Sequence, residues 1–246
     1  MKKIVCALLL SAVTLAGIFS EEKCNLDMVK IPETNIKMLK TEVTQSLYKS
    51  VMGVNPSSPY KFIGENYPIV CVSWHDAIYF CNKLSVQHGL EPVYAVNGES
   101  DVSKWNYRPN DADEQFHELY GTVTQNPNAN GYRLPTYDEW ATAAKGGEEY
   151  KYSGSDEIDE VAWHIGNSEQ INEVAQKKSN AYGLFDMSGN ATEWLWDMYD
   201  GMPKYRYLCG GSYAETSINC EITQRNCAPA TSQSANLGFR IIQNAK

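Results

Sequence analysis

The sequence predicts one α+β domain in which two main helices pack against irregular antiparallel strands. Two segments, 73–87 and 135–147, combine helix-capping residues with apolar positions at helical spacing. Most of the remaining chain consists of short apolar runs bounded by Gly, Pro, Asn and Asp, which is typical of short strands and turns. The 246 residues include 16 Tyr, 6 Trp and 6 Phe, an aromatic content suited to a full hydrophobic core. No repeat or linker divides the chain, so a single domain is expected.

The first elements in chain order are a short helix and a strand. Residues 44–52 are predicted to be helical because Leu47 and Val51 share one face, and Gly53 can end the helix. The apolar run 69–74 predicts a strand.

The two main helices carry local start signals. Ser73 and Asp76 have the spacing of a capping box, which predicts a helix running to about Gln87. Thr136 and Glu139 repeat this spacing after Pro135, and two glycines follow the second helical pattern. Between the helices, residues 97–130 are polar and are expected to form a long surface excursion, whereas residues 238–243 are expected to be extended.

The charge balance bears on possible partners. The formal net charge is −9, and the chain contains no block of Lys or Arg. Such a chain is poorly suited to binding a phosphate backbone, so nucleic acid is not expected as a partner.

Residues 1–20 resemble a secretory signal peptide. A basic start, Met1-Lys2-Lys3, precedes an apolar run that is too short for a stable membrane span. This predicts an exported protein (periplasmic, cell-surface or secreted) with a single domain over residues 21–246. No later apolar run has membrane length, so no membrane span is expected. A buried N-terminal helix and a lipid anchor at Cys24 are the alternatives, the latter opposed by the Glu-Glu-Lys that precedes this cysteine.

Cysteine content points to disulfides in an oxidising compartment. Loss of Cys6 with the leader would leave six cysteines: Cys24, Cys71, Cys81, Cys209, Cys220 and Cys227. Six cysteines allow fifteen pairings, and their spacing does not select one. No Cys-x-x-Cys pair is present, so zinc or thioredoxin chemistry is not indicated.

Several conspicuous residues are expected to belong to the scaffold. Arg133 and Arg240 lie in apolar, turn-rich contexts and are expected to bind carboxylates or carbonyls inside the fold. The aromatic residues of the same motifs are expected in the core: Trp74, Trp140, Trp194 and Phe239.

Five strings in order resemble the formylglycine-generating enzyme (sulfatase-modifying factor) family between residues 28 and 242. They are Val72-Ser73-Trp74-His75-Asp76-Ala77, Gly131-Tyr132-Arg133-Leu134-Pro135-Thr136, Gly183-Leu184-Phe185-Asp186-Met187-Ser188-Gly189-Asn190, Gly210-Gly211-Ser212-Tyr213 and Asn236-Leu237-Gly238-Phe239-Arg240. The resemblance implies a variant of the C-type lectin fold with little regular structure. It identifies a fold and does not by itself establish an activity.

The family's oxidase chemistry depends on two cysteines after the Gly-Gly-Ser-aromatic string, which bind copper and oxidise a substrate cysteine to formylglycine. Here the first position is Glu215 and only the second, Cys220, is a cysteine; Ser212 matches the serine beside the family's active site. Because Cu(I) prefers sulfur ligands, a carboxylate does not replace the missing thiolate. The protein is therefore expected to lack oxidase activity. The alternative is a copper-dependent formylglycine-generating oxidase in which Cys209 or Cys227 restores the dithiol.

The resemblance also implies a calcium site at residues 186–193. The matching family segment binds calcium through side chains at the positions of Asp186 and Glu193, and through main-chain oxygens at those of Gly189 and Ala191. Carboxylates and carbonyls are the ligands that calcium prefers. The alternative is a salt-bridge or helix-start role for the two carboxylates.

The remaining function class is ligand binding on a lectin scaffold. Between Tyr213 and Asn236 the chain departs most from the catalytic pattern, and in the related variable proteins of diversity-generating retroelements the binding residues occupy this stretch. A monomeric binder of a protein or glycan ligand is therefore predicted, with these candidate contact residues: Tyr213, Glu215, Thr216, Ile218, Glu221, Thr223, Ser232 and Gln233.

Overall fold

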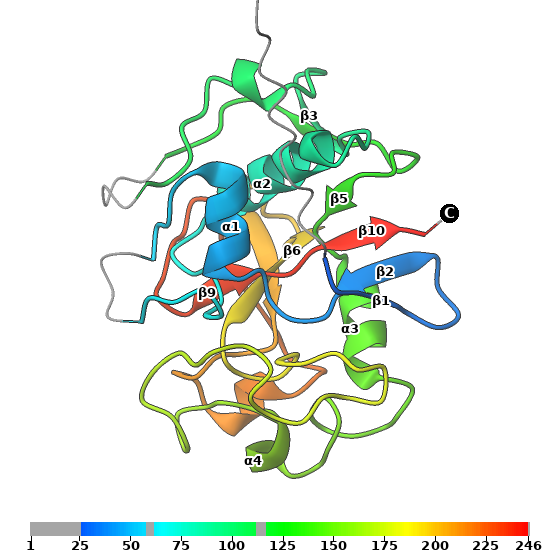
Figure 1. The fold of residues 1–246 in the computed structure, drawn as a ribbon, viewed down its shortest axis with the longest axis vertical. Coiled ribbons are helices and arrows are strands. Elements are labelled where there is room, and N and C mark those ends of the chain that lie inside the picture. Colours follow the sequence, from blue (N-terminus) through cyan, green and yellow to red (C-terminus); the bar gives the residue numbers. More distant parts are fainter. Residues whose placement is uncertain (1–25, 58–61, 112–116, 246) are drawn as a thin grey trace, which may run out of the picture.

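Short strands and irregular segments make up most of the chain in the computed structural model, which describes residues 26–57, 62–111 and 117–245 (Figure 1). The helices are α1 (Gln45–Met52), α2 (Trp74–Gln87), α3 (Tyr137–Lys145) and α4 (Ile158–Val161), with 3-10 turns η1 (Val102–Lys104) and η2 (Ser217–Cys220). The strands are β1 (Met28–Lys30), β2 (Ile36–Leu39), β3 (Tyr94–Val96), β4 (Val123–Gln125), β5 (Tyr132–Arg133), β6 (Thr192–Met198), β7 (Tyr205–Cys209), β8 (Arg225–Pro229), β9 (Leu237–Phe239) and β10 (Ile242–Asn244). This mixture confirms the predicted α+β class. The predicted leader lies outside the described residues.

Two four-stranded sheets organise the fold. One has the order β1-β2-β10-β5 and is antiparallel throughout. The other has the order β8-β7-β6-β9, in which β9 runs parallel to β6. A two-stranded ribbon joins β3 to β4. In Figure 1, α1 and α2 lie at one end of the molecule, and the irregular segment between α3 and β6 gathers with α4 at the other.

The predicted helix caps are confirmed. Ser73 and Asp76 form a complete capping box at the start of α2, and Thr136 and Glu139 form one at the start of α3. Gly53 ends α1 in the left-handed conformation, with φ of 84°. These bonds satisfy backbone groups that a helix end leaves without partners, which is why the local sequence predicts them well.

The predicted strand over residues 69–74 is wrong. Residues 69–73 form no strand, Trp74 is the first residue of α2, and the backbone N–H groups bind separate parts of the chain: Ile69 donates to Val43 O and Cys71 to Ser234 O. Cys71 has φ of 61°, a left-handed conformation that interrupts a strand. The predicted surface excursion at 97–130 is also more anchored than expected, because it supplies β4 and buries Trp105 and Leu119.

The core residues predicted from the motifs are confirmed. Trp74, Trp140, Trp194 and Phe239 are fully buried. Trp74 Nε1 donates to Leu195 O at 2.9 Å, and Trp194 Nε1 to Val72 O at 2.9 Å, so each indole is both packed and hydrogen-bonded. These contacts connect the α2 region to the central strand β6.

Both arginines predicted to act as internal anchors do so. Arg133 makes a two-point ion pair with Glu139, with Nη1–Oε2 at 2.7 Å and Nη2–Oε1 at 2.6 Å. Arg240 is fully buried and binds Glu193 through Nε and Nη2, at 3.0 and 2.8 Å from Oε1. The planar guanidinium matches a carboxylate at two points, which explains why arginine serves here.

The disulfide prediction is wrong for Cys81, Cys209, Cys220 and Cys227, which are free thiols. Cys209 and Cys227 lie on neighbouring strands but are offset, because Cys209 pairs with Arg225 and Tyr207 with Cys227. Diagonal neighbours across a sheet have Cβ atoms about 7–8 Å apart, whereas a disulfide requires about 4 Å. Cys24 lies outside the described residues. Among the described helices, none has the length and apolar character needed to cross a membrane.

Candidate functional site

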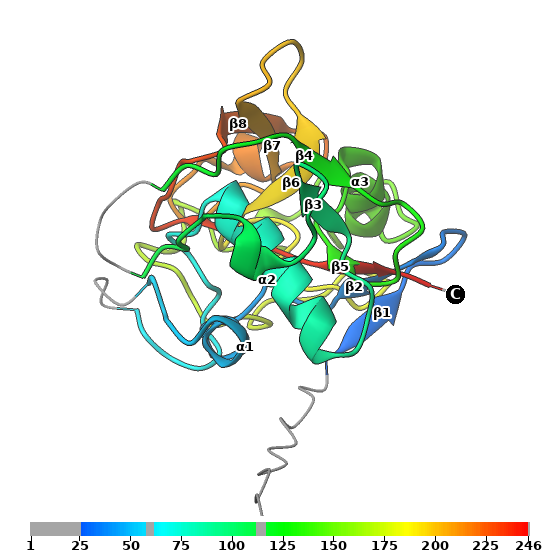
Figure 2. The ribbon, with the colours of Figure 1, turned by 90° about the horizontal axis from the view of Figure 1, so that it is seen from above.

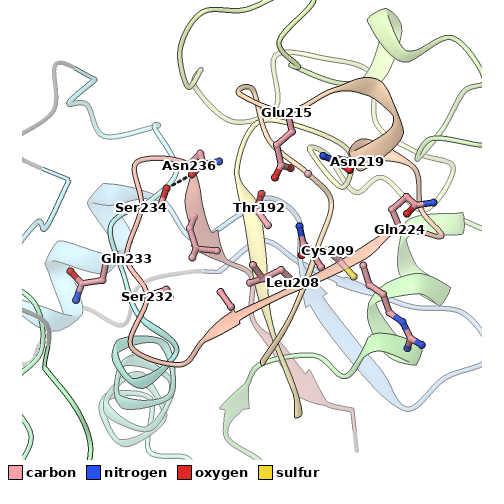
Figure 3. Close-up of a pocket in the computed structure, with 15 residues that line it drawn as sticks. Thr192, Leu208, Cys209, Glu215, Asn219, Gln224, Ser232, Gln233, Ser234 and Asn236 are labelled. Atoms are coloured by element: carbon pink, nitrogen blue, oxygen red, sulfur yellow. Dashed lines mark hydrogen bonds between the residues drawn. The ribbon is translucent and has the colours of Figure 1, made fainter. Parts of the chain in front are cut away.

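A pocket of about 370 Å³ lies where the segment after β7 meets β6, β8 and the approach to β9 (Figure 3). We call it the C-terminal pocket. Its polar lining comes from four stretches of the chain, and its main members are Thr192, Glu215, Asn219, Gln224, Ser232 and Asn236. Leu208, Ala228 and Leu237 add apolar surface. The pocket therefore combines an apolar base with convergent polar groups, the usual composition of a small-ligand site.

Glu215 is the acid of this pocket, and Figure 3 shows its side chain pointing toward Thr192. Burial raises the pKa of the Glu215 carboxyl above its usual range, and the backbone of Ser212 opposes part of that rise. Glu215 forms no salt bridge with any described residue. A carboxylate that is partly desolvated without a cation favours a ligand that brings positive charge or hydrogen-bond donors.

Two polar atoms lining the pocket also have no partners. Thr192 Oγ1 and Gln233 Nε2 are buried and make no hydrogen bond with any residue that the structure describes. Gln233 is held from its other end, because its Oε1 accepts from Asn110 Nδ2 at 2.9 Å, and in Figure 3 it points away from Glu215. Buried polar groups without partners are costly, so they indicate places where water or a ligand completes the bonding.

The Gly-Gly-Ser turn holds the loop that carries Glu215. Gly211 has φ of 66°, and a Cβ there would lie 2.7 Å from Asn219 O and 2.9 Å from Cys220 Sγ. Ser212 is fully buried; its hydroxyl accepts from Asn236 Nδ2 at 2.9 Å, and its carbonyl accepts from Glu215 N at 3.1 Å. Ser212, a candidate catalytic residue, thus connects this loop to the segment that leads into β9.

Cys220 lies beside the pocket without lining it. Its side chain is fully buried, and burial followed by the nearby Glu215 charge raises the pKa of the thiol to about 12. The thiol is therefore protonated at neutral pH, whereas a copper ligand or nucleophile must be the thiolate. The Glu215 charge acts on this thiol, so the two side chains lie near each other.

Cys209 and Cys220 lie in separate hydrophobic clusters. Cys209 packs with Trp140 and Ile222, whereas Cys220 packs in a separate cluster with Tyr152 and Val161. Burial raises the pKa of the Cys209 thiol well above its usual range. Within the described residues, no three His, Cys, Asp or Glu side chains are grouped to hold a metal ion.

Three of the eight predicted contact residues line the C-terminal pocket: Glu215, Ser232 and Gln233. The other five do not line it: Tyr213, Thr216, Ile218, Glu221 and Thr223. Tyr213 packs against the cluster around Val70, while Ile218 is 61% exposed. Sequence reasoning missed Thr192, Asn219, Gln224 and Asn236. Thr192 and Asn236 belong to or adjoin recognised motif strings, and this adjacency was the one available signal.

The four predicted calcium positions lie around a buried charge cluster. Asp186 and Glu193 are 3% and 1% exposed, and Glu193 accepts from Trp140 Nε1 at 2.8 Å as well as from Arg240. Glu42, which is fully buried, joins them: its Oε1 accepts from Asn190 Nδ2 at 3.1 Å. Its Oε2 is buried and accepts no hydrogen bond from the part of the chain that is described.

This cluster contains more acid than base. Burial, then the charge of Asp186, raises the pKa of Glu42 far above its usual range, and burial raises the pKa of Asp186 to about 6. The Glu42 and Asp186 carboxyls each act on the pKa of the other, so the two groups take up and release protons as a pair. Arg240 forms its ion pair with one of the three acids, Glu193.

Residues 19–245 match the family model of the sulfatase-modifying factor enzyme 1-like domain. The chain belongs to this family. It is 33% identical over 253 residues to the chaperone protein LppX of Paenibacillus barcinonensis, covering 93% of this chain and 87% of that protein. The structure of Treponema denticola variable protein 1 matches with a TM-score of 0.70 and 31% identity over 90% of this chain and 92% of that one. The formylglycine-generating enzyme of Streptomyces coelicolor is 29% identical over 149 residues, 47% of this chain and 48% of that enzyme.

The relatives of this sulfatase-modifying-factor-type chain thus include an enzyme, a protein named as a chaperone and a variable protein. The fold implied by the resemblance is confirmed at family level.

Proposed function

We propose that the protein is a non-catalytic binding module, exported from the cytoplasm, whose C-terminal pocket holds a positively charged side chain of a protein ligand. The observation that supports this most directly is Glu215, a partly buried carboxylate that forms no salt bridge with any described residue. A Lys or Arg side chain supplies the missing charge together with several N–H donors.

A protein ligand fits the pocket better than a glycan. Sugar hydroxyls carry no charge to compensate Glu215 in its partly desolvated position. Arg225 also lines the pocket, but its guanidinium lies over the rings of Tyr137 and Tyr207, at 4.8 and 4.7 Å from their centroids. The names of the chaperone protein LppX and of variable protein 1 are consistent with recognition of a partner.

Binding can be tested with small probes. Nα-acetyl-lysinamide and Nα-acetyl-argininamide are expected to shift backbone NMR signals around Thr192 and Glu215, whereas the uncharged Nα-acetyl-norleucinamide is not. Glu215→Gln should weaken the binding by tenfold or more, because it removes the charge from a charge-assisted hydrogen bond. Glu221→Gln is the matched control, since it makes the same change in the same loop outside the pocket.

Equal binding by both variants, or no shift with either cationic probe, would contradict the proposed site. Conversion of a cysteine-containing sulfatase peptide to an aldehyde by the copper-loaded protein would replace the binding function with the oxidase.

We also propose that calcium binds at the segment 186–193. The buried acids here outnumber Arg240, and Glu42 Oε2 has no donor among the described residues, which supports this proposal. Because the described side chains alone form no three-ligand metal group, main-chain oxygens would have to complete the coordination. Asp186 would contribute its carboxylate, with main-chain oxygens of Gly189 and Ala191; Glu193 would have to share its carboxylate with Arg240. A bound divalent cation would supply the positive charge that the cluster lacks.

Calcium is then expected to raise the melting temperature by mass action, with a larger rise at pH 8 than at pH 5, where protons compete for the acids. Asp186→Asn should abolish most of the rise. Superimposable melting curves in calcium and in excess chelator would leave the cluster without a metal role.

A further inference from the structure

A second and larger cavity, of about 710 Å³, lies beside the β6–β7 hairpin. Figure 2 shows this hairpin projecting from the body of the protein. The first turn of α2, the segment 118–123 and the ends of β6, β7 and β8 line the cavity. It shares no lining residue with the C-terminal pocket. We call it the Arg206 cavity.

Arg206 provides a cationic wall. Its guanidinium lies 4.2 Å from the ring centroid of Trp74, which is fully buried. Nη1 donates to the carbonyls of Pro203 and Tyr205 at 3.1 and 3.2 Å. Nε is buried and has no hydrogen-bond partner among the described residues. Burial lowers the pKa of Arg206, and the charge of Asp197 opposes the shift. Arg206 forms no salt bridge with a described residue.

His75 gives the cavity a second incomplete polar group. Its side chain is 7% exposed, and Nδ1 is buried without a partner in the part of the chain described. Burial, and then the positive charge of Arg206, lower the pKa of His75 to about 4, while Glu118 and the backbone of His117 act in the opposite direction. The ring is therefore neutral at pH 7, and Arg206 is close enough to act on it.

The rim is apolar and contributes little net charge. Tyr120 is 74% exposed and Met198 50% exposed, and both line the cavity. Lys204 and Glu118, the other charged residues of the lining, pair with each other at 3.4 Å. The cavity thus presents one uncompensated cation at an aromatic wall beneath exposed apolar side chains.

We propose that the Arg206 cavity binds a small amphiphilic carboxylic acid, with its carboxylate at Arg206 and His75 and its apolar part against Tyr120 and Met198. A guanidinium presents parallel N–H donors that match a carboxylate. A single negative charge balances the single uncompensated cation, whereas a dianion would leave one charge buried. The added charge also makes protonation of His75 easier, which gives Nδ1 a partner.

The carboxylate could belong to a fatty acid or to the end of a peptide, and two probes separate these sources. Octanoate represents the first and N-acetyl-phenylalanine the second, with octanamide and N-acetyl-phenylalaninamide as uncharged controls. At least one acid is expected to shift the NMR signals of the Arg206 Nε–H and the His75 ring and to raise the pKa of His75. Neither amide should do so.

Arg206→Gln should weaken the binding of the acid by tenfold or more. Arg206→Lys keeps the charge but loses the planar donors, so it should fold and show an intermediate loss. Arg225→Gln and Glu215→Gln should bind as the wild type does, which keeps this test independent of the C-terminal pocket. The proposal is overturned if neither acid binds, if amides bind equally well, or if folded Arg206→Lys binds both acids unchanged while the pKa of His75 stays constant.

Discussion

Replacing Arg240 with methionine is expected to destabilise the protein by about 3–5 kcal/mol, because it removes a cation that forms an ion pair inside a buried group of acids. Arg240 binds Glu193 at two points and donates to Leu39 O and Phe185 O at 3.0 and 2.7 Å. Without it, Glu193 keeps its charge or takes up a proton, and two carbonyls lose their donors. Both outcomes cost free energy in a site that water does not reach.

Urea unfolding monitored by tryptophan fluorescence measures this loss. In a domain of this size the change corresponds to a fall in melting temperature of roughly 10 °C. Arg225→Met is the control, since its exposed guanidinium contacts only Tyr137 and Tyr207 among rings and should cost less than about 1 kcal/mol. Arg240→Lys should fall between them. A stability of Arg240→Met close to that of the control would show that the ion pair contributes little.

Glu42→Gln is expected to stabilise the protein at pH 8 and to leave it nearly unchanged at pH 4.5. The folded-state pKa of Glu42 is raised, and that of Asp186 is raised to about 6, so the folded state holds protons that the unfolded state releases near pH 4. Stability is therefore fully retained below the unfolded pKa and is lost as pH rises through the folded pKa. For Asp186 alone the loss is about 2–3 kcal/mol at neutral pH.

Glutamine removes one of the two interacting charges. Its amide oxygen can still accept from Asn190, and its NH₂ group can donate to Asp186. The free energy of unfolding should therefore depend less on pH between 4.5 and 8 than in the wild type. Denaturant unfolding in metal-free buffer at four pH values measures this, and Glu221→Gln controls for the general loss of a negative charge. Parallel pH profiles for Glu42→Gln and the wild type would contradict a shared proton.

Local chemistry explains which elements the sequence predicted well. The caps at Ser73, Thr136 and Gly53 depend on residues within one helical turn, and all three are present as expected. The strand predicted at 69–74 depended on apolar composition alone. Its backbone instead bonds to residues far away in the chain, and the left-handed turn at Cys71 has no signature in residue type.

The candidate site was predicted only in part, for the same reason. The segment containing Glu215 could be found because it departs from the catalytic motif. Which of its side chains face the pocket depends on η2 and on the parallel pairing of β9 with β6, and neither has a local signal. Thr192 and Asn236 reach the pocket through this pairing, in which Thr192 lies opposite Leu237. Glu42 joins the charge cluster from a position 144 residues before Asp186, so local spacing gave no indication of it.

The close packing around Gly211 limits which positions of this loop can be varied in a library of variants. The backbone of Asn219 and the sulfur of Cys220 occupy the space that any side chain at position 211 would need, so randomising the whole loop would yield mostly misfolded clones. Glu215, Asn219, Gln224 and Ser232 have side chains that are at least partly exposed. A library restricted to these four codons would vary the pocket surface while keeping Gly211 and the backbone packed against it unchanged. Such a library would make the chain a starting point for selecting new binders.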